Sequence, residues 1–201
     1  MTETRQAVVA EPITEDPRVA RSRAAILAAT AALLIEEGAG GITIEGIAER
    51  SGVAKTTIYR HWKSRSQLIF DGFESMLSST PPPPPPGPVR ERLTLLLTGL
   101  VRGLTISEWA PAVTALIDAG DRDPEIQSLV HDFLVRRMAP SRMVLSEAVR
   151  TGELSPELDI DVAVSMLVGP VFYRRLVSRE PIDAALAAQV VEQFLAGAAS
   201  R

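Results

Sequence analysis

Apolar residues recur along this chain with the period of an α-helix. Near its start, Val19, Ile26 and Leu33 lie seven positions apart. Leu27 and Leu34 lie beside them, so that all five share one face of a helix. No window shows sustained alternation of apolar and polar residues, and aromatic residues make up only 4% of the chain. The pattern therefore predicts an all-α protein whose core is built by helix packing.

Two short helices are expected next, the first of them capped by Thr43. The second spans residues 53–62. Gly52 allows the positive φ of a tight turn between them. Ala48 supplies a small residue where the helices cross, and Ile58 supplies an apolar anchor. These roles at this spacing predict a helix-turn-helix unit.

A fourth helix is expected from Ser64, which forms a capping box with Gln67, to just before Pro81. The next residues, 81–88, are six prolines followed by Gly and Pro. They predict an extended polyproline segment of roughly 19 Å at about 3.1 Å per residue. The residues expected to be buried in the fourth helix are Leu68, Ile69, Phe73, Met76 and Leu77.

Helical patterns resume after the prolines, at about residues 89–105, 110–119, 124–149, 161–177 and 182–197. Asp123 followed by Pro124 is typical of a helix start. Pro140 is expected to kink or divide its helix, and the pair Gly169 and Pro170 to bend another. The predicted organisation is a mobile arm (1–17), a helix-turn-helix domain with its fourth helix (18–80), a proline-rich linker (81–88) and a helical domain (89–201).

Composition narrows the class of protein. The chain has 201 residues, 46% apolar and 23% charged, with no cysteine, which excludes disulfides and thiolate sites. No apolar run approaches the roughly 20 residues of a membrane helix, and no signal peptide is apparent, so a cytoplasmic protein is expected. We find no nucleophile paired with a base and no histidine pair at metal-ligand spacing, so no catalytic residue, metal or cofactor is expected.

Charge is distributed unevenly. The formal net charge is −4, yet the eighteen residues 48–65 contain a single acidic residue, Glu49. The basic residues of that stretch are Arg50, Lys55, Arg60, Lys63 and Arg65. Local charge decides what a surface attracts, so this stretch is a candidate DNA-binding surface. The alternative is a solvated basic face, which is the commoner explanation of a charge cluster.

The stretch TIEGIAERSGVAKTTIYRHWKSRSQL, residues 43–68, resembles the DNA-binding region of the tetracycline-repressor (TetR) family of transcriptional regulators. A weaker likeness to an effector domain of that family covers residues 109–197, in EWAPAV, RDPE, RTGELSPELD and VGPVFYRRLVSREP. The resemblance implies that bases are contacted by Lys55, Thr56 and Arg60. It implies that phosphates are contacted by Thr43, Thr57, Tyr59, His61, Lys63 and Arg65. Trp62 is interpreted as a core residue in preference to a DNA contact.

In the second domain the resemblance implies a ligand cavity and a four-helix dimer interface. Candidate cavity residues are Leu97, Trp109, Phe133, Met138 and Met143. Candidate interface residues on the last two helices are Met166, Phe172, Tyr173, Val190 and Phe194. Apolar residues at helical spacing are more often plain core, and that alternative stays open for each of them.

The preferred interpretation is a homodimeric repressor that binds a palindromic double-stranded operator and is released by a small apolar ligand. The first alternative is a DNA-binding regulator that is ligand-independent or controlled by a protein partner, and a helical enzyme ranks third. The proline run is interpreted as a passive spacer, with a dock for a polyproline-reading partner as its alternative.

Overall fold

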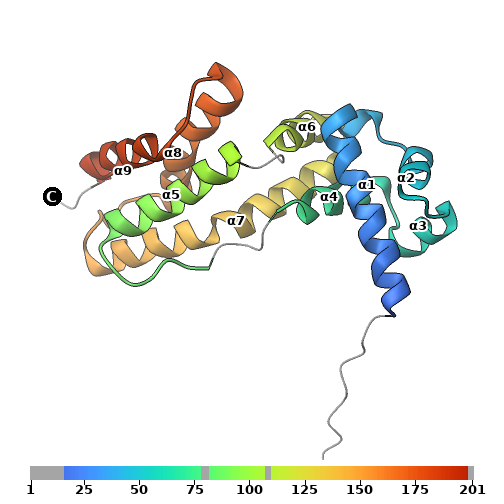
Figure 1. Cartoon of the computed structure of the whole chain (residues 1–201). Helices are drawn as coiled ribbons and strands as arrows, with labels where there is room; N and C mark the ends of the chain where they lie inside the picture. The colour runs from blue at the N-terminus through green and yellow to red at the C-terminus, as the bar shows by residue number, and fades with distance from the viewer. Residues whose placement is uncertain (1–15, 78–81, 107–109, 199–201) are drawn as a thin grey trace, which may run out of the picture.

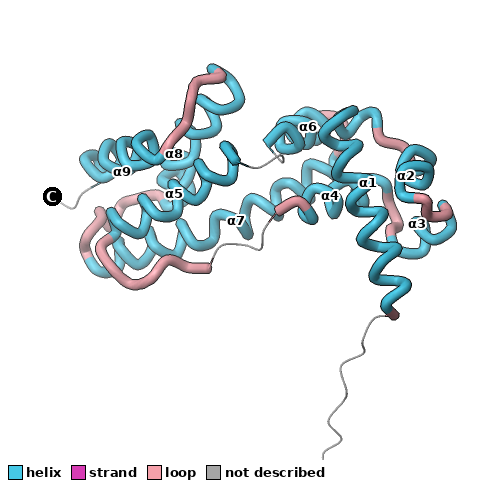
Figure 2. The backbone as a smooth tube through the Cα atoms, in the orientation of Figure 1, coloured by secondary structure: helices cyan, strands magenta, loops and turns pink. Residues whose placement is uncertain are grey.

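The computed structural model describes residues 16–77, 82–106 and 110–198, and within these ranges every regular element is a helix (Figures 1 and 2). The predicted all-α class is confirmed. The elements are α1 (Pro17–Gly41), α2 (Ile44–Ser51), α3 (Lys55–His61), α4 (Arg65–Ser75), α5 (Val89–Ile106), α6 (Ala110–Gly120), α7 (Pro124–Thr151), α8 (Ile160–Phe172), the π-helical turn η1 (Tyr173–Ser178) and α9 (Ala184–Ala198). Most of the arm predicted at 1–17 lies outside the described residues, and Pro17 already belongs to α1.

Helices α1 to α4, α6 and the first part of α7 surround one core, which we call the head core. Figure 1 shows α6 lying beside α1, although α6 follows the proline segment in sequence. Buried residues of the head core are Ile26, Leu34, Ile47, Ile58, Leu68, Ile69, Phe70, Phe73, Ala112, Leu116 and Ile126. Three of these, from α6 and α7, come from beyond the prolines. The proline segment therefore separates stretches of sequence, whereas the packing crosses it.

Helices α5, α8, α9 and the second part of α7 surround a separate body core. Its buried residues include Leu93, Leu97, Leu104, Val144, Leu145, Val164, Leu167, Val171, Val191 and Phe194. The 28-residue helix α7 passes from the head to the body, as Figure 1 shows. An α-helix of this length spans roughly 42 Å at 1.5 Å per residue, so α7 is a continuous mechanical link between the two cores.

Side chains cap several helices at their first turn, as the sequence predicts. Thr43 Oγ1 accepts from the N–H of Gly46 at 3.0 Å, and Ser64 Oγ accepts from the N–H of Gln67 at 3.0 Å. The carboxylate of Asp123 accepts from two N–H groups at the start of α7. The capping box expected at Ser64 is only half formed, because the Gln67 amide donates to Asp71 at 2.6 Å instead of returning to the cap.

Two prolines that were expected to kink, divide or bend their helices both lie within continuous helices. Pro140 does not divide its helix: α7 is continuous through it. A proline φ near −65° is already helical, so the main loss is the hydrogen bond of its missing N–H. Helix α8 likewise continues through Gly169 and Pro170, and changes to π-helical geometry at Tyr173. Helix α1 contains a break at Gly38, where φ is +70°.

Helix α1 has a length and composition that would also suit a membrane span, in contrast to the sequence expectation. It is the one such helix among the described residues. Its apolar face, including Ile26 and Leu34, is buried in the head core against α2, α4 and α6. The apolar character of α1 is therefore accounted for by packing inside the protein.

Candidate DNA-binding site and ligand cavity

The turn between α2 and α3 has the geometry of a helix-turn-helix. Gly52 ends α2 in the left-handed region, with φ +67° and ψ 15°. A residue with a Cβ is strained in that conformation, which explains glycine at this position. Ile47 and Ile58 are fully buried and hold the two helices on the head core. The roles predicted for Gly52 and Ile58 are both present in the structure.

Four of the predicted DNA contacts share the exposed side of α3: Lys55, Thr56, Tyr59 and Arg60. Tyr59 is 61% exposed, which is unusual for so large a ring and leaves it available to a partner. Lys55 Nζ donates to Glu45 Oε1 at 2.5 Å, and this hydrogen bond lowers the pKa of Glu45. Both partners are exposed, so a DNA phosphate or base can compete for Lys55 at small cost.

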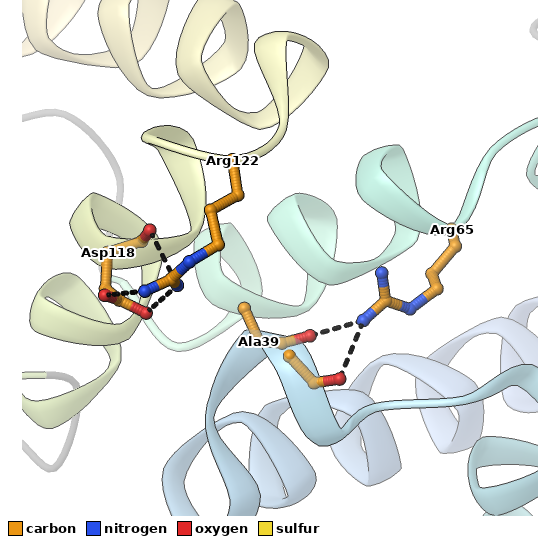
Figure 3. Close-up of polar contacts among 5 residues, drawn as sticks. Ala39, Arg65, Asp118 and Arg122 are labelled. Atoms are coloured by element: carbon orange, nitrogen blue, oxygen red, sulfur yellow. Dashed lines mark hydrogen bonds and ion pairs between the residues drawn. The ribbon is translucent and has the colours of Figure 1, made fainter.

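The other five predicted contacts lie around this surface in different environments. Thr43 is exposed with its hydroxyl on the α2 cap, Thr57 is half-buried, and Lys63 is exposed. His61 is half-buried, with its ring 5.6 Å from that of Trp62. Arg65 differs from the rest, because its guanidinium is bound to the protein. Arg65 Nε donates to the carbonyl of Ile42 at 2.6 Å. Its Nη2 donates to the carbonyl of Ala39 at 2.5 Å, as Figure 3 shows.

The basic stretch 48–65 therefore offers fewer available cations than its composition indicates. Arg50 donates two hydrogen bonds to Glu36, at 2.5 and 2.6 Å. Lys55 is paired with Glu45, and Arg65 lies against backbone carbonyls. Within the described part of the chain, Arg60 and Lys63 are the two basic residues of this stretch without a polar partner. Sequence alone does not distinguish them, because the pairing residues belong to α1 and α2.

Trp62 lies in the core, as preferred from the sequence, and its 4% exposure rules out a direct reading role for its ring. Its indole Nε1 donates to Asp71 Oδ2 at 2.8 Å. Arg23 of α1 lies over the same ring, 5.7 Å from its centroid, and 3.9 Å from Asp71. A cation over an indole face is attracted by the ring quadrupole. This cluster fixes the end of α3 to both α1 and α4.

Two hydroxyls join the start of α4 to the start of α7. Ser64 Oγ donates to Glu125 Oε1 at 2.6 Å, and Ser66 Oγ donates to Asp123 Oδ2 at 2.6 Å. We call these four residues the serine clasp. The Ser66 hydrogen bond is the main reason that the pKa of Asp123 is lowered. Ser64 lies three residues after His61, the last residue of α3. The serine clasp therefore connects the end of α3 to the start of α7.

A cavity of about 760 Å³ lies among α4, α5, α6, α7, α8 and the proline segment. Of the predicted ligand residues, Leu97, Phe133 and Met138 line it. Trp109 lies outside the described residues. Met143 does not line the cavity and is 43% exposed.

The sequence prediction of the cavity wall missed Phe73 and the charged residues Arg137, Arg142 and Asp161. Phe73 of α4 meets Phe133 of α7 edge-on, with ring centroids 5.4 Å apart. Arg137 lines the same cavity, and burial lowers its pKa. Arg142 forms an ion pair with Asp161 at the wall. The wall is thus apolar over most of its area with a few charged groups, which is the composition typical of a small-molecule site.

The predicted dimer residues fall into two sets. Met166 and Tyr173 are exposed, at 54% and 59%. Val162 and Val177 extend the same stripe at helical spacings, and the sequence prediction missed them. Phe172 and Val190 are half-buried against the body core, and Phe172 lines the cavity. Phe194 is 4% exposed and belongs to the core of its own chain.

Phe194 is therefore unavailable to a partner, since α9 directs it at Leu-rich neighbours in the body core. The stripe on α8 and η1 is available. Among the described residues, no group of three or more His, Asp or Glu side chains is arranged to hold a metal ion. The described residues thus present a polar exposed surface on α3, an apolar cavity between the two cores, and an apolar stripe on α8 and η1.

Comparisons with known proteins agree with this arrangement. A sequence profile described as "Bacterial regulatory proteins, tetR family" matches residues 26–71. A second, described as "Tetracyclin repressor-like, C-terminal domain", matches residues 83–194, more than half of the chain.

Individual relatives match over most of their length. The uncharacterized HTH-type transcriptional regulator YdeS of Bacillus subtilis is 32% identical over 171 residues, covering 83% of this chain and 84% of YdeS. The DNA-binding transcriptional repressor TetR of Mycobacteroides abscessus is 27% identical, covering 86% and 90%. The crystal structure of the TetR family transcription regulator SCO0332 superposes with a TM-score of 0.65 at 32% identity, covering 88% and 98%. This chain belongs to the TetR family of bacterial transcriptional regulators.

Proposed function

We propose that this regulator is a cytoplasmic homodimeric repressor that binds a palindromic operator and leaves it when a small apolar ligand enters the cavity. The observation that carries the proposal is the position of α4. Ser64 at its start adjoins the recognition helix α3, and Phe73 near its end lines the cavity. One short helix thus adjoins the DNA-binding surface at its start and lines the cavity near its end. A ligand in the cavity that moves α4 would therefore also move α3. The family consists of regulators, and we propose no catalytic activity.

On the DNA side, we assign base reading to Lys55, Thr56 and Arg60, all exposed on α3. Lysine and arginine donors suit the O6 and N7 acceptors of guanine in the major groove. Phosphate contacts are assigned to Thr43, Thr57, Tyr59, His61 and Lys63. We assign no direct DNA contact to Arg65. Its hydrogen bonds hold the connection between α1 and α2 beside the start of α4, so it affects DNA binding only by positioning these helices.

Dimerisation is assigned to the exposed stripe of Val162, Met166, Tyr173 and Val177. A contiguous exposed apolar patch on a soluble protein marks an interaction site. A two-fold axis through this stripe pairs the α8–α9 ends of two chains and leaves both heads free. Two recognition helices must then lie roughly 34–36 Å apart to enter successive major grooves.

The release step follows from that spacing requirement. A ligand in the cavity contacts Phe73 of α4 and Phe133 of α7, whose rings already meet. Displacing one ring from the other shifts α4 relative to α7, and the serine clasp passes the shift to the start of α4. A coupling free energy of about 1–3 kcal/mol corresponds to roughly 5–150-fold release. The ligand fitted to this wall is apolar over most of its surface.

The proposal is tested by selecting a preferred site from random duplex DNA with the full chain, and then titrating that site. Lys55→Ala should lose base preference, with affinity for the selected site falling more than affinity for random DNA. Lys63→Ala should weaken both equally and reduce the salt slope. Glu45→Gln is the matched control on the same surface: it frees Lys55 and should strengthen binding.

Apolar compounds are then titrated into the protein–operator complex. Release by a compound that binds the protein supports the repressor proposal. Compounds that bind the cavity without changing operator affinity would favour a regulator controlled by a protein partner.

A further inference from the structure

We propose that the proline segment forms a selective wall of the ligand cavity, and that it admits ligands whose adjoining surface is apolar or carries only hydrogen-bond donors. This inference rests on the proposed function of the cavity as a ligand site. It gives the six-proline run a role that neither a passive spacer nor a dock for a polyproline-reading protein provides.

The position of the segment is the first argument. Pro82, Pro83, Pro84 and Pro85 all line the cavity, together with leucines of α5 and Phe73 of α4. Pro84 is buried, whereas Pro86 is exposed and lies outside the cavity wall. Proteins that read polyproline dock aromatic grooves on exposed proline rings. A buried ring at the centre of the run is better suited to facing the interior of its own protein.

Hydrogen-bonding chemistry is the second argument. A segment without helix or strand structure normally carries free N–H groups, and an N–H against an apolar ligand weakens binding because it loses its water without gaining a partner. Proline has no backbone N–H. Five consecutive described prolines, 82–86, therefore let extended backbone lie beside an apolar cavity without orphan donors. The wall presents ring methylenes and carbonyl oxygens, so it accepts hydrogen bonds and donates none.

Selectivity follows from this one-sided chemistry. A ligand carboxylate or carbonyl facing the segment would meet carbonyl oxygens and lose its hydration without gaining a donor. An aromatic or aliphatic surface, or an N–H group, meets no such penalty. The charged groups at the wall, Arg137, Arg142 and its partner Asp161, lie on α7 and α8, so a polar group of a ligand meets charge on those helices and not at the proline segment. The proline segment consequently orients the ligand as well as enclosing it.

Rigidity is the third argument. A polyproline helix has few accessible backbone states before binding, so little entropy is lost when it closes against a ligand. Replacing one proline by alanine restores an N–H and loosens the backbone, at residue 86 at least as much as at residue 84, because residue 84 is followed by proline and residue 86 by glycine. The two effects are separable, because only a position on the wall exposes the new N–H to the ligand.

The experiment compares Pro84→Ala with Pro86→Ala, using the neutral fluorescent amine N-phenyl-1-naphthylamine as probe and the full chain. Pro84→Ala should weaken probe affinity about 10-fold, the loss of one buried unpaired N–H. Pro86→Ala should stay within about 2-fold of wild type, since its N–H faces water. Pro83→Ala, at an exposed residue of the wall, serves as a second variant should Pro84→Ala unfold. Operator affinity without probe should be unchanged in all three.

Each outcome decides a separate point. Equal losses in Pro84→Ala and Pro86→Ala would attribute the effect to linker stiffness and overturn the wall assignment. Unchanged probe affinity in Pro83→Ala and Pro84→Ala would overturn it as well. Failure of the probe to bind the wild-type protein would overturn both the wall and the ligand site. Probe binding that leaves operator affinity unchanged would overturn ligand release while leaving the wall intact.

Discussion

The head and the body of this protein are both built from α-helices, but they differ in how much of their apolar surface is buried. In the head, apolar side chains such as Ile47 and Ile58 are fully buried, and the exposed side of α3 is polar apart from the ring of Tyr59. Between the head and the body the helices leave a cavity of about 760 Å³, and the body carries an exposed apolar stripe on α8 and η1. The exposed surface of the head is thus mainly polar, whereas the body leaves apolar surface uncovered, at the cavity that it shares with the head and on the stripe.

The largest effect on stability and DNA binding is expected from a substitution in the head core. Ile58→Ala removes the only fully buried side chain of α3, at a cost of about 2–5 kcal/mol. Since α3 has seven residues and no side-chain cap, it should lose its position and operator binding should disappear. Thermal unfolding and a DNA titration measure the two losses. Met143→Ala, at an exposed residue outside the cavity wall and the stripe, is the control and should change stability by less than about 0.5 kcal/mol.

In the body, the next largest effect should fall on assembly and leave the fold intact. Met166→Arg places a charge in the exposed stripe, where a buried unpaired cation opposes dimerisation. We expect a dimer dissociation constant raised by at least about 30-fold, measured by sedimentation, with an unchanged helical signal. Ser146→Arg, exposed on α7 away from the stripe, is the matched control. Equal dissociation in both variants would contradict the interface assigned to α8.

A third test concerns how α1 and α4 fit together in the head. A Cβ at Gly72 would lie 2.7 Å from Thr30 Cγ2, and the Thr30 hydroxyl is held by its 2.8 Å hydrogen bond to the Ile26 carbonyl. Gly72→Ala should destabilise the protein by about 1–3 kcal/mol through this overlap. Adding Thr30→Ser removes the methyl and should restore part of the loss. A double-mutant cycle in urea with no coupling would refute the close contact.

The smallest expected effect is the pH dependence of the serine clasp. The Ser66 hydrogen bond lowers the folded-state pKa of Asp123, so this carboxylate stabilises the fold above its unfolded pKa of about 3.9. The stabilisation is lost as the pH falls through the lowered value. Ser66→Ala should therefore be less stable by under about 1 kcal/mol at pH 7, with the difference shrinking in acid. A constant difference across that range would exclude the clasp as its source.

The contrast between head and body also explains what sequence alone could predict. Helix starts depend on residues close in sequence, so a short stretch of sequence was enough to identify the caps Thr43, Ser64 and Asp123. The turn at Gly52 is equally local. The pairing of Arg50, Lys55 and Arg65 depends on α1, α2 and their connection, and a basic stretch read by itself overstates the free charge.

Burial and exposure in the body were harder to predict, because the sequence of an apolar helix face does not show which surface it packs against. Phe194 and Met166 are both apolar residues of the last helices, yet Phe194 is buried in its own chain and Met166 is exposed. Met143 and Met138 differ in the same way at the cavity. The proline run was interpreted as a domain boundary. Helix α6 follows the run in sequence, yet it packs in the head core, because helices that are distant in sequence can be neighbours in the fold.

The most direct test of the link between cavity and recognition helix is a reciprocal titration with N-phenyl-1-naphthylamine and the selected operator. Linkage requires that the probe weaken operator binding by the same factor by which the operator weakens probe binding. We predict a common factor of roughly 5–150-fold in the wild-type protein. Saturating probe that leaves the operator dissociation constant unchanged would contradict the account.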